Sequence, residues 1–83
     1  MNIQVRYFAS LREALGPSET IAMPPGSTVG QLRDVLLALG GRHAEALTRN
    51  RAVRSALNQT LCDESALLSA DAEVAFFPPV TGG

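Results

Sequence analysis

The fold class is predicted most directly from one segment, Thr28-Val29-Gly30-Gln31-Leu32-Arg33-Asp34-Val35-Leu36-Leu37-Ala38-Leu39. Thr28 and Gln31 have the spacing of a capping box, so a helix is expected to begin here. Its apolar residues recur at i, i+3, i+4 and i+7, which predicts one buried stripe. Gly40-Gly41 is expected to end the helix. A helix with one apolar face can cover one face of a sheet, which favours an α+β fold. The stripe predicted to be buried is Leu32, Val35, Leu36 and Leu39.

Alternating sequences on both sides of this helix predict a sheet of four or five strands. The first two strands are expected to form an antiparallel hairpin. A short helix lies in their connection, because Ser10 and Glu13 have capping-box spacing. Asn58-Gln59 is typical of a turn, and residues 42–49 are expected to form a short extra helix. The predicted strands cover residues 2–8, 19–23, 52–58, 60–62 and 72–77.

Strand alternation sorts the side chains onto two faces of this sheet. Phe8 and Phe77 have the opposite parity from the main apolar set, so both are expected on the face that the helix leaves open. Exposed aromatic side chains on such a face indicate a partner surface. Burial of Phe77 against a loop is the plain alternative. The side chains expected under the helix are Ile3, Val5, Tyr7, Ile21, Met23, Val74 and Phe76.

Composition excludes several classes of function. A chain of 83 residues builds one core, and its net charge of -1 gives no electrostatic case for nucleic acid or an anionic membrane. No apolar run approaches the roughly 20 residues of a membrane span. The N-terminus lacks the pattern of a signal peptide. A lone cysteine, Cys62, makes no internal disulfide, so we expect a reducing, cytoplasmic location.

The last residues read as a strand, a double proline and a slender tail. Pro78 and Pro79 lack N–H donors, so they end the strand ladder and stiffen the base of the tail. We expect one domain over residues 1–79 and an extended, flexible tail over residues 80–83, which spans roughly 13 Å. Gly83 then presents an α-carboxylate on a backbone without side chains, suited to a narrow tunnel. A frayed end is the plain alternative.

The rest of the chain offers little chemistry. Cys62 is expected to be a partly buried small apolar residue, and His43 a surface histidine. Potential metal ligands do not cluster, so no metal site is predicted. The turn at Pro24-Pro25-Gly26 is not a phosphate-binding loop.

Two stretches of the chain resemble the small, sulfur-carrying subunits of molybdopterin synthase. They are Ala56-Leu57-Asn58-Gln59-Thr60-Leu61 and Glu73-Val74-Ala75-Phe76-Phe77-Pro78-Pro79-Val80-Thr81-Gly82-Gly83. The element order is similar over essentially the whole chain. The resemblance implies a ubiquitin-like β-grasp with a mixed four- to five-stranded sheet and one main helix. The sequence departs from the family at Ser69-Ala70-Asp71-Ala72, where a more glycine- and aspartate-rich turn is usual.

The resemblance implies a carrier cycle rather than catalysis by this chain alone. An activating enzyme adenylates the Gly83 carboxylate with ATP, and a sulfur donor converts it to a thiocarboxylate. Val80, Thr81 and Gly82 then enter the large subunit of a heterotetrameric synthase, where sulfur passes to cyclic pyranopterin monophosphate. The chain itself binds no cofactor. The implied partner-binding residues are Phe8, Arg12, Leu61, Phe77, Pro78 and Pro79.

Two other functions stay open from the sequence. The chain could be a sulfur carrier of another pathway, such as the thiamin type, although those carriers are usually shorter. It could also be a ubiquitin-like modifier joined to lysines, or a plain interaction module. For Arg12, a solvated helix arginine is an equally simple interpretation.

Overall fold

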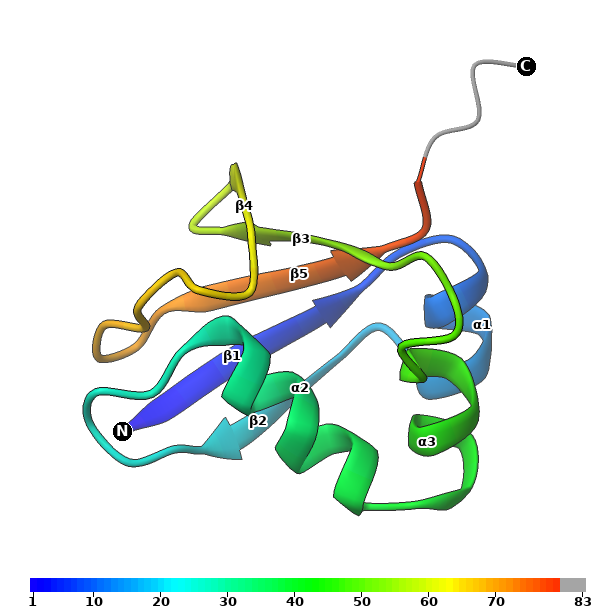
Figure 1. Cartoon of the computed structure of the whole chain (residues 1–83), viewed down its shortest axis with the longest axis horizontal. Coiled ribbons are helices and arrows are strands. Elements are labelled where there is room, and N and C mark those ends of the chain that lie inside the picture. The colour runs from blue at the N-terminus through cyan, green and yellow to red at the C-terminus, as the bar shows by residue number, and fades with distance from the viewer. Residues whose placement is uncertain (80–83) are drawn as a thin grey trace.

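The computed structural model describes residues 1–79, which form a five-stranded mixed sheet and three helices (Figure 1). The strands lie in the order β2-β1-β5-β3-β4. Strands β1 and β5 are parallel, and the other neighbours are antiparallel. Helix α2 crosses one face of the sheet, while α1 and α3 pack together at one end. The bounds are β1 Asn2–Tyr7, α1 Ser10–Leu15, β2 Ser18–Ala22, α2 Val29–Ala38, α3 Gly41–Leu47, β3 Arg54–Leu57, β4 Thr60–Cys62 and β5 Glu73–Phe77.

This architecture confirms the predicted α+β class and element order. Strands β1 and β2 form the expected antiparallel hairpin with α1 in their connection. Asn58 and Gln59 join β3 to β4 with φ of 49° and 70°. Two consecutive residues with positive φ match a two-residue hairpin of type I′, which explains the turn at this dipeptide. The predictions for Val80, Thr81, Gly82 and Gly83 lie outside the described residues.

The start of α2 is capped as predicted. The Gln31 N–H donates to Thr28 Oγ1 at 3.2 Å, and the Thr28 N–H donates to Gln31 Oε1 at 2.9 Å. Gly40, with φ of 73°, follows the last residues of α2 and reverses the chain. Gly40 also precedes Gly41, the first residue of α3. The two glycines therefore connect α2 to α3, whereas the sequence predicted only that they end α2.

The buried stripe of α2 differs from the predicted one. Leu32 and Leu36 are fully buried, but Val35 is 39% exposed and Leu39 is 55% exposed. Val29 and Arg33 take the remaining inward positions. The buried face of α2 is therefore rotated about the helix axis relative to the predicted one. Arg33 is buried because its hydrogen-bond partners come from residues far from it in the sequence.

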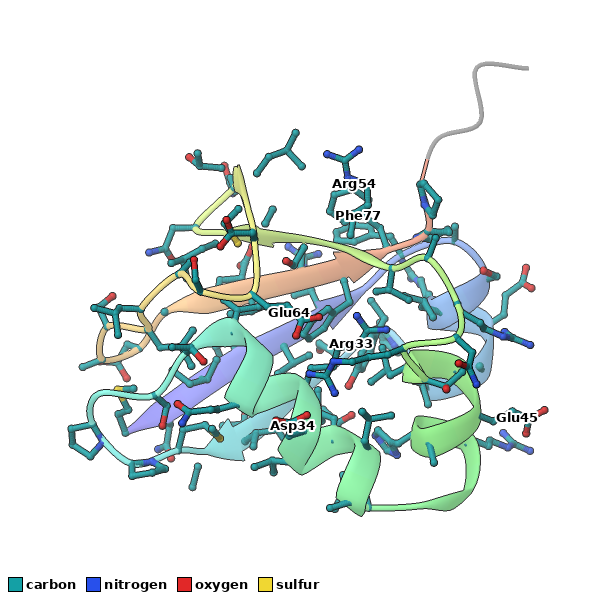
Figure 2. The ribbon with its side chains drawn as sticks, viewed as in Figure 1. Arg33, Asp34, Glu45, Arg54, Glu64 and Phe77 are labelled. Atoms are coloured by element: carbon teal, nitrogen blue, oxygen red, sulfur yellow. The ribbon has the colours of Figure 1, made fainter. Side chains whose placement is uncertain are left out.

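Arg33 is only 5% exposed, and its guanidinium holds two other segments of the chain to α2 (Figure 2). Its Nε donates to the Leu47 carbonyl at 2.8 Å, and its Nη2 donates to the Thr48 carbonyl at 3.0 Å. Its Nη1 donates to Glu64 Oε2 at 2.9 Å. The end of α3 and the loop before β5 are thereby held to one buried side chain. Buried charge is tolerated when it is paired and hydrogen-bonded in this way.

Glu64 joins this network to the start of α2. Its second oxygen accepts from Arg49 Nη2 at 2.8 Å, and the two arginines, Arg49 foremost, hold the pKa of Glu64 below its usual value. Its carbonyl accepts the Gly30 N–H at 2.9 Å. A Cβ at position 30 would lie 3.0 Å from Glu64 Oε1, so glycine permits this close approach.

The sheet face under α2 is mostly as predicted. Six of the seven expected side chains are buried, and Ile21, on the edge strand β2, is half-buried against the core. The buried Tyr7 hydroxyl donates to Glu19 Oε2 at 2.7 Å. Burial and this carboxylate raise the pKa of Tyr7 well above its ordinary value. The six buried residues are Ile3, Val5, Tyr7, Met23, Val74 and Phe76.

His43 is not the surface residue that was predicted. It is half-buried on α3, and its Nε2 lies 2.6 Å from Glu19 Oε2, the same oxygen that accepts from Tyr7. The half-buried position of His43 is explained by this contact. Glu19, on β2, accepts from Tyr7 on β1 and contacts His43 on α3, so one carboxylate oxygen connects the three elements. Cys62 is half-buried, as expected, 3.6 Å from Ser55 Oγ.

Helix α1 begins differently from the prediction. Ser10 is its first residue, and its side chain makes no capping hydrogen bond. The preceding Ala9 lies at the cap position with φ of 54° and ψ of -132°. The Phe8 carbonyl instead accepts the N–H groups of Leu11 and Arg12, at 3.2 Å and 3.4 Å. A backbone carbonyl therefore organises this helix start, which a capping-box pattern does not reveal.

Candidate partner-binding face

The sheet face away from α2 gathers the residues that the sequence singles out. Cross-strand pairing places Ala56 opposite both Ala75 and Leu61, and Arg54 opposite Phe77. Paired residues share a face, so these side chains form one continuous surface. The two alanines are short, which leaves the larger side chains raised around them. This surface, called the open face below, comprises Arg6, Phe8, Arg54, Ala56, Leu61, Ala75 and Phe77.

Phe8 lies at the end of β1, beside the last residues of β5. Its N–H donates to the Phe76 carbonyl at 3.2 Å, so it extends the parallel pairing of the two strands. Its ring is 39% exposed, and the Arg6 guanidinium lies 5.5 Å from the ring centroid. A cation over an aromatic face is attracted by the ring and limits its motion. Phe8 is thus an exposed aromatic ring in a defined place.

Phe77 lies on the neighbouring strand, next to Arg54, on the side of the sheet away from α2 (Figure 2). It is half-buried, and the half-buried Pro78 and Pro79 follow it directly. The last described residues, Pro78 and Pro79, therefore follow directly on an aromatic residue of the open face. The aromatic surface and the root of the tail are adjacent.

Leu61 extends the open face to its far edge. It lies on the edge strand β4 and is 61% exposed, so water covers most of an apolar side chain. Arg12 lies on α1 behind Phe8 and is exposed. The structure therefore brings Phe8, Phe77 and the prolines together, with Leu61 and Arg12 at the margins.

The sequence analysis did not single out Arg6 and Arg54. Arg6 is half exposed on β1, with its Nη1 3.9 Å from Glu73 Oε2, and Arg54 is exposed beside Phe77. These two residues add two guanidinium groups to the open face. Such an arrangement suits an acidic partner surface. Arg6 could have been predicted, because it lies two residues before Phe8 on the same strand and so shares its face. Arg54 could not, because its strand alternates too weakly to assign a face.

Among residues 1–79, none of the predicted site residues lines the pocket between α1 and α3. Its volume is about 370 Å³, and it is lined by Glu13, Ala14, Arg42, Glu45, Ala46 and Arg51. Within residues 1–79, no three His, Cys, Asp or Glu side chains gather as metal ligands would. Across the same residues, no helix is long and apolar enough to cross a membrane.

The mixed sheet, the crossing helix and the parallel central pair β1–β5 define a ubiquitin-like β-grasp protein. The chain belongs to the ThiS family, whose family model matches residues 5–83. A relative from Escherichia coli, named molybdopterin synthase sulfur carrier subunit, is 42% identical over 98% of this chain and 99% of its own. The sequence resemblance is thereby confirmed.

Solved structures agree with this assignment. A putative molybdopterin converting factor, subunit 1, from Pyrococcus furiosus is 26% identical, with a TM-score of 0.80 over 96% of this chain and 99% of that chain. The Helicobacter pylori complex of subunits 1 and 2 of molybdopterin-converting factor contains a chain that is 25% identical. Its TM-score is 0.71, with full coverage of both chains. That neighbour was solved with a protein partner.

Proposed function

We propose that this chain is the sulfur carrier of molybdenum cofactor biosynthesis and the small subunit of a molybdopterin synthase. The observation that carries the proposal is the match to the Escherichia coli carrier over 98% of the chain, together with the open face at the root of the tail. The complex of the Helicobacter pylori neighbour supports a large subunit as the partner. The lone cysteine supports a cytoplasmic location.

The chemistry centres on the α-carboxylate of Gly83. A carboxylate is ionised near neutral pH, because its reference pKa is about 3.3–3.7. Its oxygen attacks the α-phosphorus of ATP within an activating enzyme, and pyrophosphate leaves. Sulfur from a donor then attacks the acyl carbon, AMP leaves, and a thiocarboxylate remains. Transfer of that sulfur to cyclic pyranopterin monophosphate, followed by hydrolysis, returns the carboxylate.

The catalytic groups in this cycle belong to the partners. The chain supplies the reagent, Gly83, and the reach of Val80, Thr81 and Gly82. It binds no cofactor of its own, and ATP is consumed by the activating enzyme. The open face, with Phe8, Leu61 and Phe77, holds the partner while Pro78 and Pro79 direct the tail.

Intact-mass spectrometry tests the carrier proposal directly. The chain is incubated with the activating enzyme, ATP and a sulfur donor, and the expected product carries one oxygen-to-sulfur exchange at Gly83. Without ATP the mass should not change, because adenylation supplies the leaving group. An unchanged mass under conditions that charge the Escherichia coli carrier contradicts the proposal. Restored molybdenum-enzyme activity in a strain lacking its small subunit separates this pathway from a thiamin-type carrier.

Replacing Leu61 should weaken the complex with the large subunit without weakening the fold. Leu61→Ala removes an apolar anchor that water already surrounds in the free chain, so its unfolding midpoint should stay near that of the wild type. Its dissociation constant should rise about tenfold, as when an apolar side chain that a partner covers is truncated. Isothermal titration calorimetry measures the constant, and circular dichroism measures the midpoint.

Leu67 offers a matched control. It is 67% exposed but lies in the loop paired with Thr28 at the start of α2. Leu67→Ala also truncates a leucine of similar solvent exposure, but at a position outside the open face. Equal losses of affinity in the two variants would show that the open face is not the docking surface.

A further inference from the structure

Ala9 has a backbone conformation that alanine rarely adopts. Its φ of 54° and ψ of -132° match the first central residue of a type II′ turn. The turn is closed by the Leu11 N–H, which donates to the Phe8 carbonyl at 3.2 Å. Glycine normally occupies this position, because a Cβ is crowded there. The alanine is therefore strained.

The other residues with positive φ do not need the same explanation. Asn58 and Asp71, at φ of 49° and 59°, belong to residue types that tolerate left-handed backbone. Gln59, at φ of 70°, is the second central residue of the type I′ hairpin between β3 and β4, a turn that requires positive φ at both positions. Ala9 has no polar side chain with which to stabilise such a turn. Its strain persists because its neighbours fix both ends of the turn.

Those neighbours are well defined. On one side, the Phe8 N–H is bound to the Phe76 carbonyl of β5. On the other, the Glu13 N–H donates to the Ala9 carbonyl at 3.2 Å, and Leu11 is buried in the core. The chain must turn from a strand into a helix across one residue. Ala9 is that residue.

Ala9 lies between two of the predicted partner-binding residues. Phe8, with its exposed ring, precedes Ala9, and Arg12 follows it on the first turn of α1. Strained backbone that its surroundings enforce is concentrated at functional sites, where it fixes geometry in advance. A glycine would adopt the turn without strain, but it would also allow other conformations of Phe8 and Arg12.

We propose that Ala9 is a positioning residue for partner binding, whose restricted backbone holds Phe8 and Arg12 in the orientation that the large subunit recognises. The inference rests on the proposed function, since it concerns the same docking surface. Fixing side chains before contact lowers the entropy lost on binding. On this proposal, alanine restricts a turn that glycine would leave free to adopt other conformations.

Ala9→Gly tests the inference, because stability and affinity should respond differently. Relief of strain should leave the unfolding midpoint unchanged or raise it. The dissociation constant for the large subunit should nevertheless rise about three- to tenfold, which corresponds to one or two side chains ordered on binding. Amide ¹⁵N relaxation should show increased motion at residues 8–12 in the free variant.

Asp71→Gly is the matched control. It also replaces a residue of positive φ by glycine, but in the turn before β5, off the open face. Its affinity should equal that of the wild type. If Ala9→Gly binds as tightly as the wild type while its midpoint rises, the strain has no part in docking and the inference is overturned. If the wild type fails to bind, or Leu61→Ala binds as tightly as it, the docking proposal itself has failed.

Discussion

Deleting Gly83 should abolish sulfur transfer while leaving the fold unchanged. The deletion moves the terminal carboxylate back by about 3.3–3.6 Å, the length of one extended residue. Misplacement of a reacting atom by as little as 1 Å can lower a rate by about 10²-fold, so a loss of at least that size is expected. Both charging by the activating enzyme and delivery to the large subunit should fail.

Stability provides the internal control for this deletion. The hydrophobic core and the paired strands described above lie within residues 1–79. The unfolding midpoint of the shortened chain should therefore match that of the wild type. Intact mass after charging and the rate of molybdopterin formation measure the functional loss. Full activity of the shortened chain would show that this protein is an interaction module and not a carrier.

Replacing Arg33 should have the largest effect on stability. Arg33→Ala removes the donors that satisfy the carbonyls of Leu47 and Thr48 and leaves Glu64 with one arginine fewer. Two unsatisfied carbonyl acceptors and a broken, partly buried ion pair together lower stability by about 2–4 kcal/mol. A domain has about 5–15 kcal/mol in total, so this loss is a large share. Urea unfolding followed by circular dichroism measures it.

Arg49→Ala is the matched control for Arg33→Ala. Arg49 contacts the same carboxylate, and also Asp34 Oδ1 at 2.5 Å, but its side chain is exposed. Exposed ion pairs contribute about 0–1 kcal/mol, because water screens them. The Arg49 variant should therefore unfold at nearly the wild-type urea concentration. Equal losses in both variants would show that burial of Arg33 contributes nothing.

Strand alternation predicted the sheet well, because its period of two assigns each side chain to a face by local rules. Val5, Val74 and Phe76 are buried as the parity of their strands required. Helix burial was harder to predict. Arg33 is inside because its hydrogen-bond partners come from residues 47, 48 and 64, and a local pattern contains none of them. The predicted stripe therefore included Val35 and Leu39, which are exposed.

The partner face was predictable to the extent that it depends on parity. Phe8 and Phe77 follow from alternation alone, and the tail follows from its own sequence. Arg54 was missed because β3 alternates weakly, and because its position beside Phe77 follows only from the register of β3 against β5. The positive φ of Ala9 could not be predicted from the sequence, because alanine rarely adopts such a backbone conformation. It exists because strand and helix are both anchored around it.

The central place of β5 has a mechanical consequence. A partner that withdraws the tail pulls on β5 along its length, and β5 lies between β1 and β3 with backbone pairing on both sides. The load is then shared by both rows of hydrogen bonds in shear, whereas an edge strand would be peeled away one bond at a time. We therefore expect that β5 resists a pull on its carboxyl end better than an edge strand would.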